Sequence, residues 1–176
     1  MITADLLRAI VAGYSLHLHG VHGLAHWARV FENGRKLAAA TGADLRVVEL
    51  FAVFHDARRL NDDHDPGHGR RGAELAARLR GRHFDLDDQA FALLSEACEQ
   101  HTDGRTTGDI TLRTCWDADR LDLRRCHIVP DPTRLATAAA RDPMLLAWAD
   151  QRARTCFEPL LLREVWLPML DDHGAR

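Results

Sequence analysis

Cysteine is scarce in this chain of 176 residues, and none of its four cysteines forms a C-x-x-C pair. They are Cys98, Cys115, Cys126 and Cys156. Three of them fall within expected helices, so we interpret the set as reduced, small buried side chains and not as a disulfide framework. The first residues also lack the apolar region of a signal peptide. These absences predict a cytoplasmic protein.

Lysine is almost absent, because Lys36 is the only one among 23 Lys and Arg residues, and the net charge is −3. A chain without a basic field is not expected to attract nucleic acid or anionic lipid. No apolar stretch approaches the length of a membrane span. We therefore expect neither a membrane nor a nucleic-acid partner, and the pattern specifies no oligomeric state.

Several common catalytic motifs are also missing. The chain contains no Gly-rich phosphate loop, no G-x-S-x-G nucleophile elbow and no H-E-x-x-H zincin motif. The alternation typical of strands is absent, and β-branched residues are sparse beside Ala, Leu and Arg. The composition, 46% hydrophobic and 28% charged, is that of a globular protein. We expect one all-α domain that is long enough to bury a substantial core.

Apolar spacing and capping residues predict helices along most of the chain. The expected helices cover about residues 3–16, 21–40, 44–56, 70–80, 85–101 and 111–124, and a final helical segment opens at Asp142-Pro143 with interruptions near Pro159 and Pro168. Between the third and fourth helices lies a loop at 61–69, NDDHDPGHG, which is dense in turn formers and in His and Asp.

A histidine and a carboxylate stand side by side at His55-Asp56, where the apolar run 47–54 ends. Burying such a pair is costly unless something compensates it. A divalent metal is one compensation, because a neutral imidazole and a carboxylate are both good ligands. The alternative is that His55 favours the helix C-terminus as imidazolium and that Asp56 pairs with Arg58 or Arg59.

Other histidines could complete a site. His22 and His26 lie four residues apart on one helix face, so both could bind a metal, or one could bind it while the other contacts substrate. His64, His68 and His101 fall in the loop and at a helix end. They could support the ligands, hold a second metal or donate a proton to a leaving group. The alternatives are that His22 and His26 lie on a half-exposed helix face and that the loop histidines are exposed to solvent. For His101 the alternative is a helix C-terminus, which favours imidazolium.

Helical phase separates two aspartates of the expected helix 111–124. Asp117 shares a face with three arginines at spacings of three and four residues, which favours a solvated ladder of ion pairs. Asp119 shares the opposite, apolar face with Trp116 and Leu123. A carboxylate on that face needs a partner from elsewhere in the fold. We therefore favour Asp119 over Asp117 as a metal ligand.

The order of these residues resembles the HD-domain superfamily of metal-dependent phosphohydrolases. The similar segments are HWARV at 26–30, FHDARR at 54–59, HDPGHG at 64–69 and ADRLD at 118–122. The resemblance covers about residues 16–125. It implies that residues 1–176 form a single HD domain with a five-helix core and a helical extension over about 133–172.

By this resemblance the metal ligands are His26, His55, Asp56 and Asp119. Some branches hold two ions that the Asp of the His-Asp pair bridges. The further ligands here would be His68 and His101, with His64 as the competitor for the first role. The expected ion is divalent: Mn, Mg, Co, Ni, Zn or Fe.

The expected function is hydrolysis of a nucleotide or other small phosphoester by metal-activated water. Asp56 would orient or deprotonate the water, and His68 or His101 would protonate the leaving oxygen. The candidates for substrate binding are His22, Arg29, Arg59, His64 and Arg70. Two alternatives are a di-iron oxygenase of the same fold and a catalytically silent metal-containing domain that binds a nucleotide or a partner.

Overall fold

The structure, a computed structural model, describes residues 2–171, and every regular element in that range is helical. The helices are α1 (Ala4–Val11), α2 (Leu24–Thr41), α3 (Leu45–Phe54), α4 (His68–Leu79), α5 (Asp88–Gln100), α6 (Ile110–Arg120), α7 (Pro143–Arg154) and α8 (Leu167–Asp171). Short 3-10 helices occur at Leu123–Cys126, Pro132–Arg134 and Ala139–Arg141, and a π-helix occurs at Leu161–Trp166. The all-α prediction is confirmed.

No helix among the described residues is long and apolar enough to cross a membrane. Residue 1 and residues 172–176, where the expected domain and its extension have their ends, lie outside the described part.

At three expected helix starts, residues 3, 44 and 142, the first residue caps the helix. The Thr3 hydroxyl accepts from the Leu6 amide at 3.2 Å, and the Asp44 carboxylate accepts from the Arg46 amide at 2.8 Å. Asp142 caps α7 with Pro143 as its first residue. Such caps depend on residues within one turn of each other, which makes them readable from sequence.

Some predicted boundaries are wrong. The first helix ends at Val11 and not near Leu16, because turns occupy residues 12–23. The fourth begins at His68, two residues earlier than expected. Pro168 does not end the last helical run, because the π-helix Leu161–Trp166 continues directly into α8.

One interpretation of the cysteines also needs correction. Cys98 and Cys115 are buried, as expected, but Cys126 is half-buried and Cys156 is exposed in a turn after α7. All four are free thiols.

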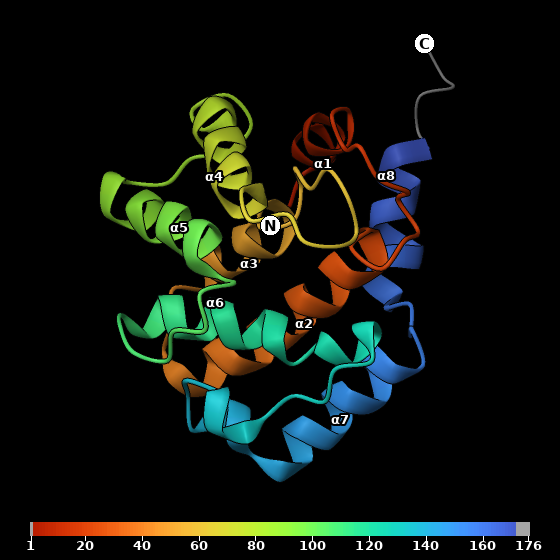
Figure 1. Cartoon of the computed structure of the whole chain (residues 1–176). Helices are drawn as coiled ribbons and strands as arrows, with labels where there is room; N and C mark the ends of the chain where they lie inside the picture. Colours follow the sequence, from red (N-terminus) through yellow and green to blue (C-terminus); the bar gives the residue numbers. More distant parts are fainter. Residues whose placement is uncertain (1, 172–176) are drawn as a thin grey trace.

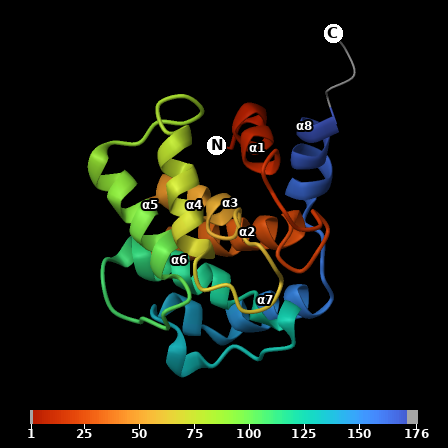
Figure 2. The ribbon, with the colours of Figure 1, turned by 45° about the horizontal axis from the view of Figure 1, so that its top comes forward.

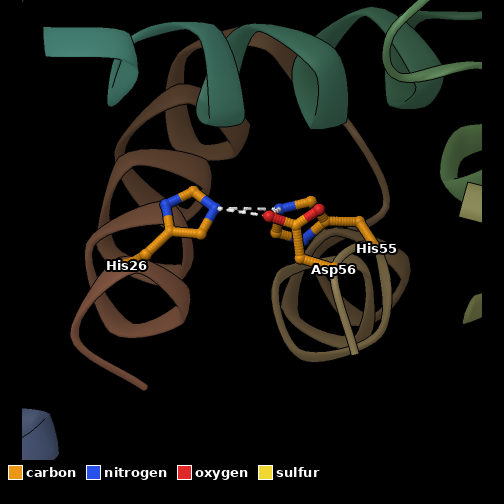
Figure 3. Close-up of side chains that lie close together, drawn as sticks. All are labelled: His26, His55 and Asp56. Carbon is orange, nitrogen blue, oxygen red and sulfur yellow. Dashed lines mark hydrogen bonds and ion pairs between the residues drawn. The ribbon is translucent and has the colours of Figure 1, made fainter. Parts of the chain in front are cut away.

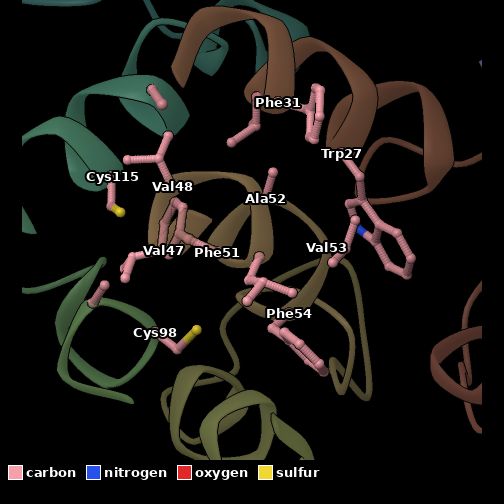
Figure 4. Close-up of a cluster of buried hydrophobic side chains, with 14 of the residues drawn as sticks. Trp27, Phe31, Val47, Val48, Phe51, Ala52, Val53, Phe54, Cys98 and Cys115 are labelled. Carbon is pink, nitrogen blue, oxygen red and sulfur yellow. The ribbon is translucent and has the colours of Figure 1, made fainter. Parts of the chain in front are cut away.

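The helices surround α3, whose residues from Val47 to Phe54 are all buried (Figure 4). A helix that is apolar on all sides belongs in a core. Helix α2 crosses the middle of the molecule and packs against α3 and α6 (Figure 1). Helices α4 and α5 pack against each other beside α3, while α8 lies on the opposite side of the molecule (Figure 2). The end of α3 therefore carries His55 and Asp56 into the interior.

Candidate metal centre

His55 and His26 bring two ring nitrogens together at the end of α3. The Nε2 atoms of the two histidines lie 3.0 Å apart, and both side chains are fully buried (Figure 3). The other nitrogen of each ring has its own acceptor. His55 Nδ1 donates to the Phe51 carbonyl at 3.1 Å, and His26 Nδ1 donates to the Asp122 carboxylate at 2.7 Å.

This hydrogen bonding determines what can lie between the rings. A neutral imidazole that donates from Nδ1 presents a lone pair at Nε2. Two lone pairs 3.0 Å apart repel each other unless a cation lies between them. Burial lowers the pKa of His55 to about 3, so its imidazole is neutral near pH 7, which is the form that binds metals.

Two carboxylates complete this group. Asp56 Oδ2 lies 3.5 Å from His26 Nε2 and 3.7 Å from His55 Nε2. Asp119 Oδ1, from α6, lies 3.5 Å and 3.8 Å from the same two nitrogens. Donor atoms that surround an ion at about 2.0–2.2 Å stand roughly 3–3.6 Å from each other. The nitrogens of His26 and His55 and the Asp56 oxygen come close to this spacing and could hold a metal ion. Asp119 Oδ1 lies within 4 Å of both nitrogens.

The Asp119 carboxylate is the clearest sign of a missing partner. Its Oδ1 atom is buried and accepts no hydrogen bond from the described residues. Burial alone would raise the pKa of Asp119, but the charge of Arg125 and the nearby imidazole of His55 lower it below its usual value. An ionised, buried oxygen without a hydrogen bond is costly, and a bound cation would remove that cost.

A second group shares Asp56 with the first. Asp56 Oδ1 lies 3.2 Å from His68 Nε2 and 3.8 Å from His101 Nε2, and these two nitrogens are 2.9 Å apart. The opposite nitrogens contact backbone carbonyls, those of Asp65 and Cys98. Both groups, His26-His55-Asp56 and Asp56-His68-His101, could hold a metal ion.

Asp56 is ionised in this setting. Burial alone would raise its pKa, but neighbouring His55 and hydrogen bonding to His101 hold it well below its usual range. Each of its two oxygens lies near a different pair of histidines. Oδ2 lies near His26 and His55, and Oδ1 lies near His68 and His101.

Two glycines allow α4 to approach the centre. A Cβ atom on Gly69 would lie 2.2 Å from the Cys98 carbonyl oxygen, and one on Gly72 would lie 2.3 Å from the Phe54 carbonyl oxygen. No side chain fits at such distances. The glycines therefore let α4 contact the ends of α5 and α3, and this close approach brings His68 beside His101.

The sequence interpretation missed the role of Asp122. Its carboxylate accepts from His26 Nδ1 at 2.7 Å and from Arg29 through two nitrogens, at 2.7 and 3.0 Å. A carboxylate behind a ligand histidine fixes the ring and raises its basicity. One sequence signal could have indicated this role: Asp122 follows Asp119 by about one helical turn, so the two side chains lie near each other.

Arg125 was also missed. Its side chain is buried, with Nη1 3.6 Å from Asp119 Oδ1 and Nη2 3.9 Å from Asp56 Oδ2. It also donates to the carbonyl of Val21 at 3.0 Å. No sequence signal separated it from Arg124, the other arginine of this 3-10 helix.

The expected substrate-binding residues have different positions. His22 lies beside the centre, with Nδ1 2.9 Å from Asp56 Oδ2. Arg59 lies beside the second group, with Nη1 3.1 Å from His68 Nε2. Arg29 is buried against Asp122.

The remaining two are not brought to the centre. His64 is exposed in its loop, and the exposed side chain of Arg70 pairs with Glu74. Of the competing loop histidines, it is therefore His68 that reaches Asp56.

The expectation that Asp117 belongs to a solvated ladder of ion pairs is wrong about solvent exposure, although Asp117 Oδ1 does pair with Arg120 Nη1 at 3.6 Å. Asp117 is fully buried, and its carboxylate accepts from the amides of Ala136 and Thr137 at 2.8 Å each. The segment after α6 covers this face of the helix, and Arg113 and Arg120 donate to its backbone carbonyls. Asp119 still points to the histidines, as its helical phase indicated.

Comparisons of the chain with protein-family models, curated proteins and solved structures found no match. What the centre does must therefore be inferred from its own chemistry.

Proposed function

We propose that this chain is a metal-dependent phosphohydrolase of the HD-domain type that acts on a nucleotide or another small phosphoester. The observation that carries the proposal is the convergence of His26, His55, Asp56 and Asp119 with an unsatisfied carboxylate oxygen among them. The same residues could hold an ion that only stabilises the fold, but such a site would be closed to substrate. Here Asp119 and His101 also line a cavity, which gives a substrate access to the ligands.

A divalent ion in this centre would supply Lewis-acid activation of water and of a phosphoryl oxygen. The protein groups then have separate tasks. Arg125 is the arginine best placed to bind phosphate oxygens, because its guanidinium faces both Asp119 and Asp56. Asp56 orients the attacking water, and His101 stands on the cavity side, where a leaving oxygen needs a proton.

A second candidate function is a di-iron oxygenase. It is favoured by the way Asp56 directs one oxygen to each histidine pair, which gives six donors for two ions. Iron content, colour and an activity that depends on O₂ would identify it.

The test is metal analysis of the purified protein followed by a phosphoester screen with Mn²⁺, Co²⁺, Ni²⁺ and Mg²⁺. We expect bound metal and metal-dependent release of phosphate. Asp119→Ala should lose both, whereas the control Asp150→Ala, which removes a half-exposed carboxylate paired with Arg124, should keep both. Arg125→Lys should keep the metal and lose most of the activity. Metal without phosphate release from any ester would reject the proposal.

A further inference from the structure

A cavity of about 410 Å³ opens beside the candidate metal centre. His101 and Asp119 are among the residues that line it. Small-molecule sites usually measure about 300–1,000 Å³, so the space suits a compact organic group. Because two members of the centre line the cavity, a phosphoester bound at the centre would extend its other half into this space.

Part of the cavity lining is an apolar wall. It is formed by Leu123, Ile128, Val129, Pro130 and Leu135. Ile128 and Val129 are 53% and 63% exposed. Single exposed apolar residues are common, but a contiguous apolar face beside a candidate active site indicates a ligand.

The wall is held in place by α6, the helix that carries Asp119. Arg120 donates to the carbonyls of Arg134 at 3.0 Å and Arg105 at 2.6 Å, which joins the loops on the two sides of the cavity. Asp117 binds the amides of Ala136 and Thr137 in the same segment. These buried contacts fix the cavity relative to the metal ligands before any ligand binds.

The cavity lining also includes two exposed charged side chains, the carboxylate of Asp131 and the guanidinium of Arg134. A guanidinium can stack on the face of an aromatic ring. A sugar or a polyphosphate chain would leave the apolar wall without a matching surface, while a ring would cover it.

We infer that this cavity binds the leaving group of the substrate and selects a phosphoester whose leaving group carries a planar, largely apolar ring. The inference rests on the proposed function and specifies its substrate class. The segment 128–135, which the family resemblance does not cover, provides the selectivity.

Phosphonates test the inference without turnover, because their P–C bond takes the place of the ester bond. Calorimetric titration of the metal-loaded protein should give phenylphosphonate an affinity at least about tenfold higher than that of methylphosphonate, as expected for a group that fills an apolar pocket. Ile128→Ser should reduce this ratio several-fold. Leu160→Ser, at a residue that is also 53% exposed but lies outside the cavity lining, should leave the ratio unchanged.

Three results would overturn the inference. Equal affinities for the two phosphonates in the native protein would reject the ring site while leaving the metal centre supported. An unchanged ratio in Ile128→Ser would show that the ring binds elsewhere. Failure of both phosphonates to bind would reject the inference and the proposed function together.

Discussion

At the scale of single residues, His26 is held from both sides. Its Nδ1 donates to Asp122, and its Nε2 faces His55 and Asp119. Asp122 is 1% exposed and keeps its charge in contact with Arg29. The pair therefore orients the ring and makes Nε2 a stronger donor to a metal.

Replacing this carboxylate by an amide tests its role. Asp122→Asn keeps the shape but removes the charge, so the metal affinity should fall by about 10–100-fold. Competition titration against a chelator measures it. Asp88→Asn, which removes an exposed carboxylate paired with Arg80, serves as control and should bind metal as the native protein does. Equal affinity in both variants would mean that Asp122 acts only in folding.

The sequence predicted part of this centre because its signals are local. The His-Asp pair ends an apolar run, and helical phase distinguishes Asp119 from Asp117; both follow from neighbouring residues. The surroundings of Asp117 could not be predicted, because the segment that covers it comes about 20 residues later. For the same reason the sequence did not identify Arg125 as a neighbour of the centre. It also did not distinguish Arg29, which is buried, from Arg70, which is exposed.

At the scale of elements, α6 carries one buried carboxylate on each of two faces, and the two carboxylates have different functions. One face directs Asp119 to the histidines, and the other uses Asp117 to hold the segment at 136–137. Asp117 accepts three hydrogen bonds, two from backbone amides and one from the Thr137 hydroxyl. Helix positions and most caps were predictable from periodicity, whereas which face meets which segment depends on the packing of the whole chain.

Two alanine substitutions separate these faces. In the metal-free protein, Asp117→Ala should lower the free energy of unfolding by on the order of 3 kcal/mol, because buried amides lose a charged acceptor. Asp119→Ala should cost less, since Asp119 Oδ1 accepts no hydrogen bond from the described residues. Urea denaturation of both variants measures the difference. If Asp119→Ala proved as destabilising as Asp117→Ala, the carboxylate of Asp119 would have a structural role that its contacts do not explain.

At the scale of the whole molecule, the centre joins segments that are far apart in sequence. Its donors come from α2, the end of α3, the start of α4, the end of α5 and α6. The all-α class could be predicted, because helical periodicity and the lack of strand patterns are visible in every segment. The arrangement after residue 126 could not, because no motif covers it and its 3-10 and π elements have weak sequence signals.

Because the centre connects five elements, metal binding should stabilise the entire fold. An ion that binds only the folded chain, at 100 times its dissociation constant, contributes about 2.7 kcal/mol. For a domain of this size that corresponds to a rise of about 5–10 °C in the unfolding midpoint. Calorimetric scans of metal-loaded and chelator-treated protein near pH 7.5 measure the shift. Acidification should reduce it, because protons compete with the metal for the imidazole nitrogens. In Asp119→Ala the shift should largely disappear. A shift of native size in this variant would show that the stabilising ion binds outside the centre around His26 and His55.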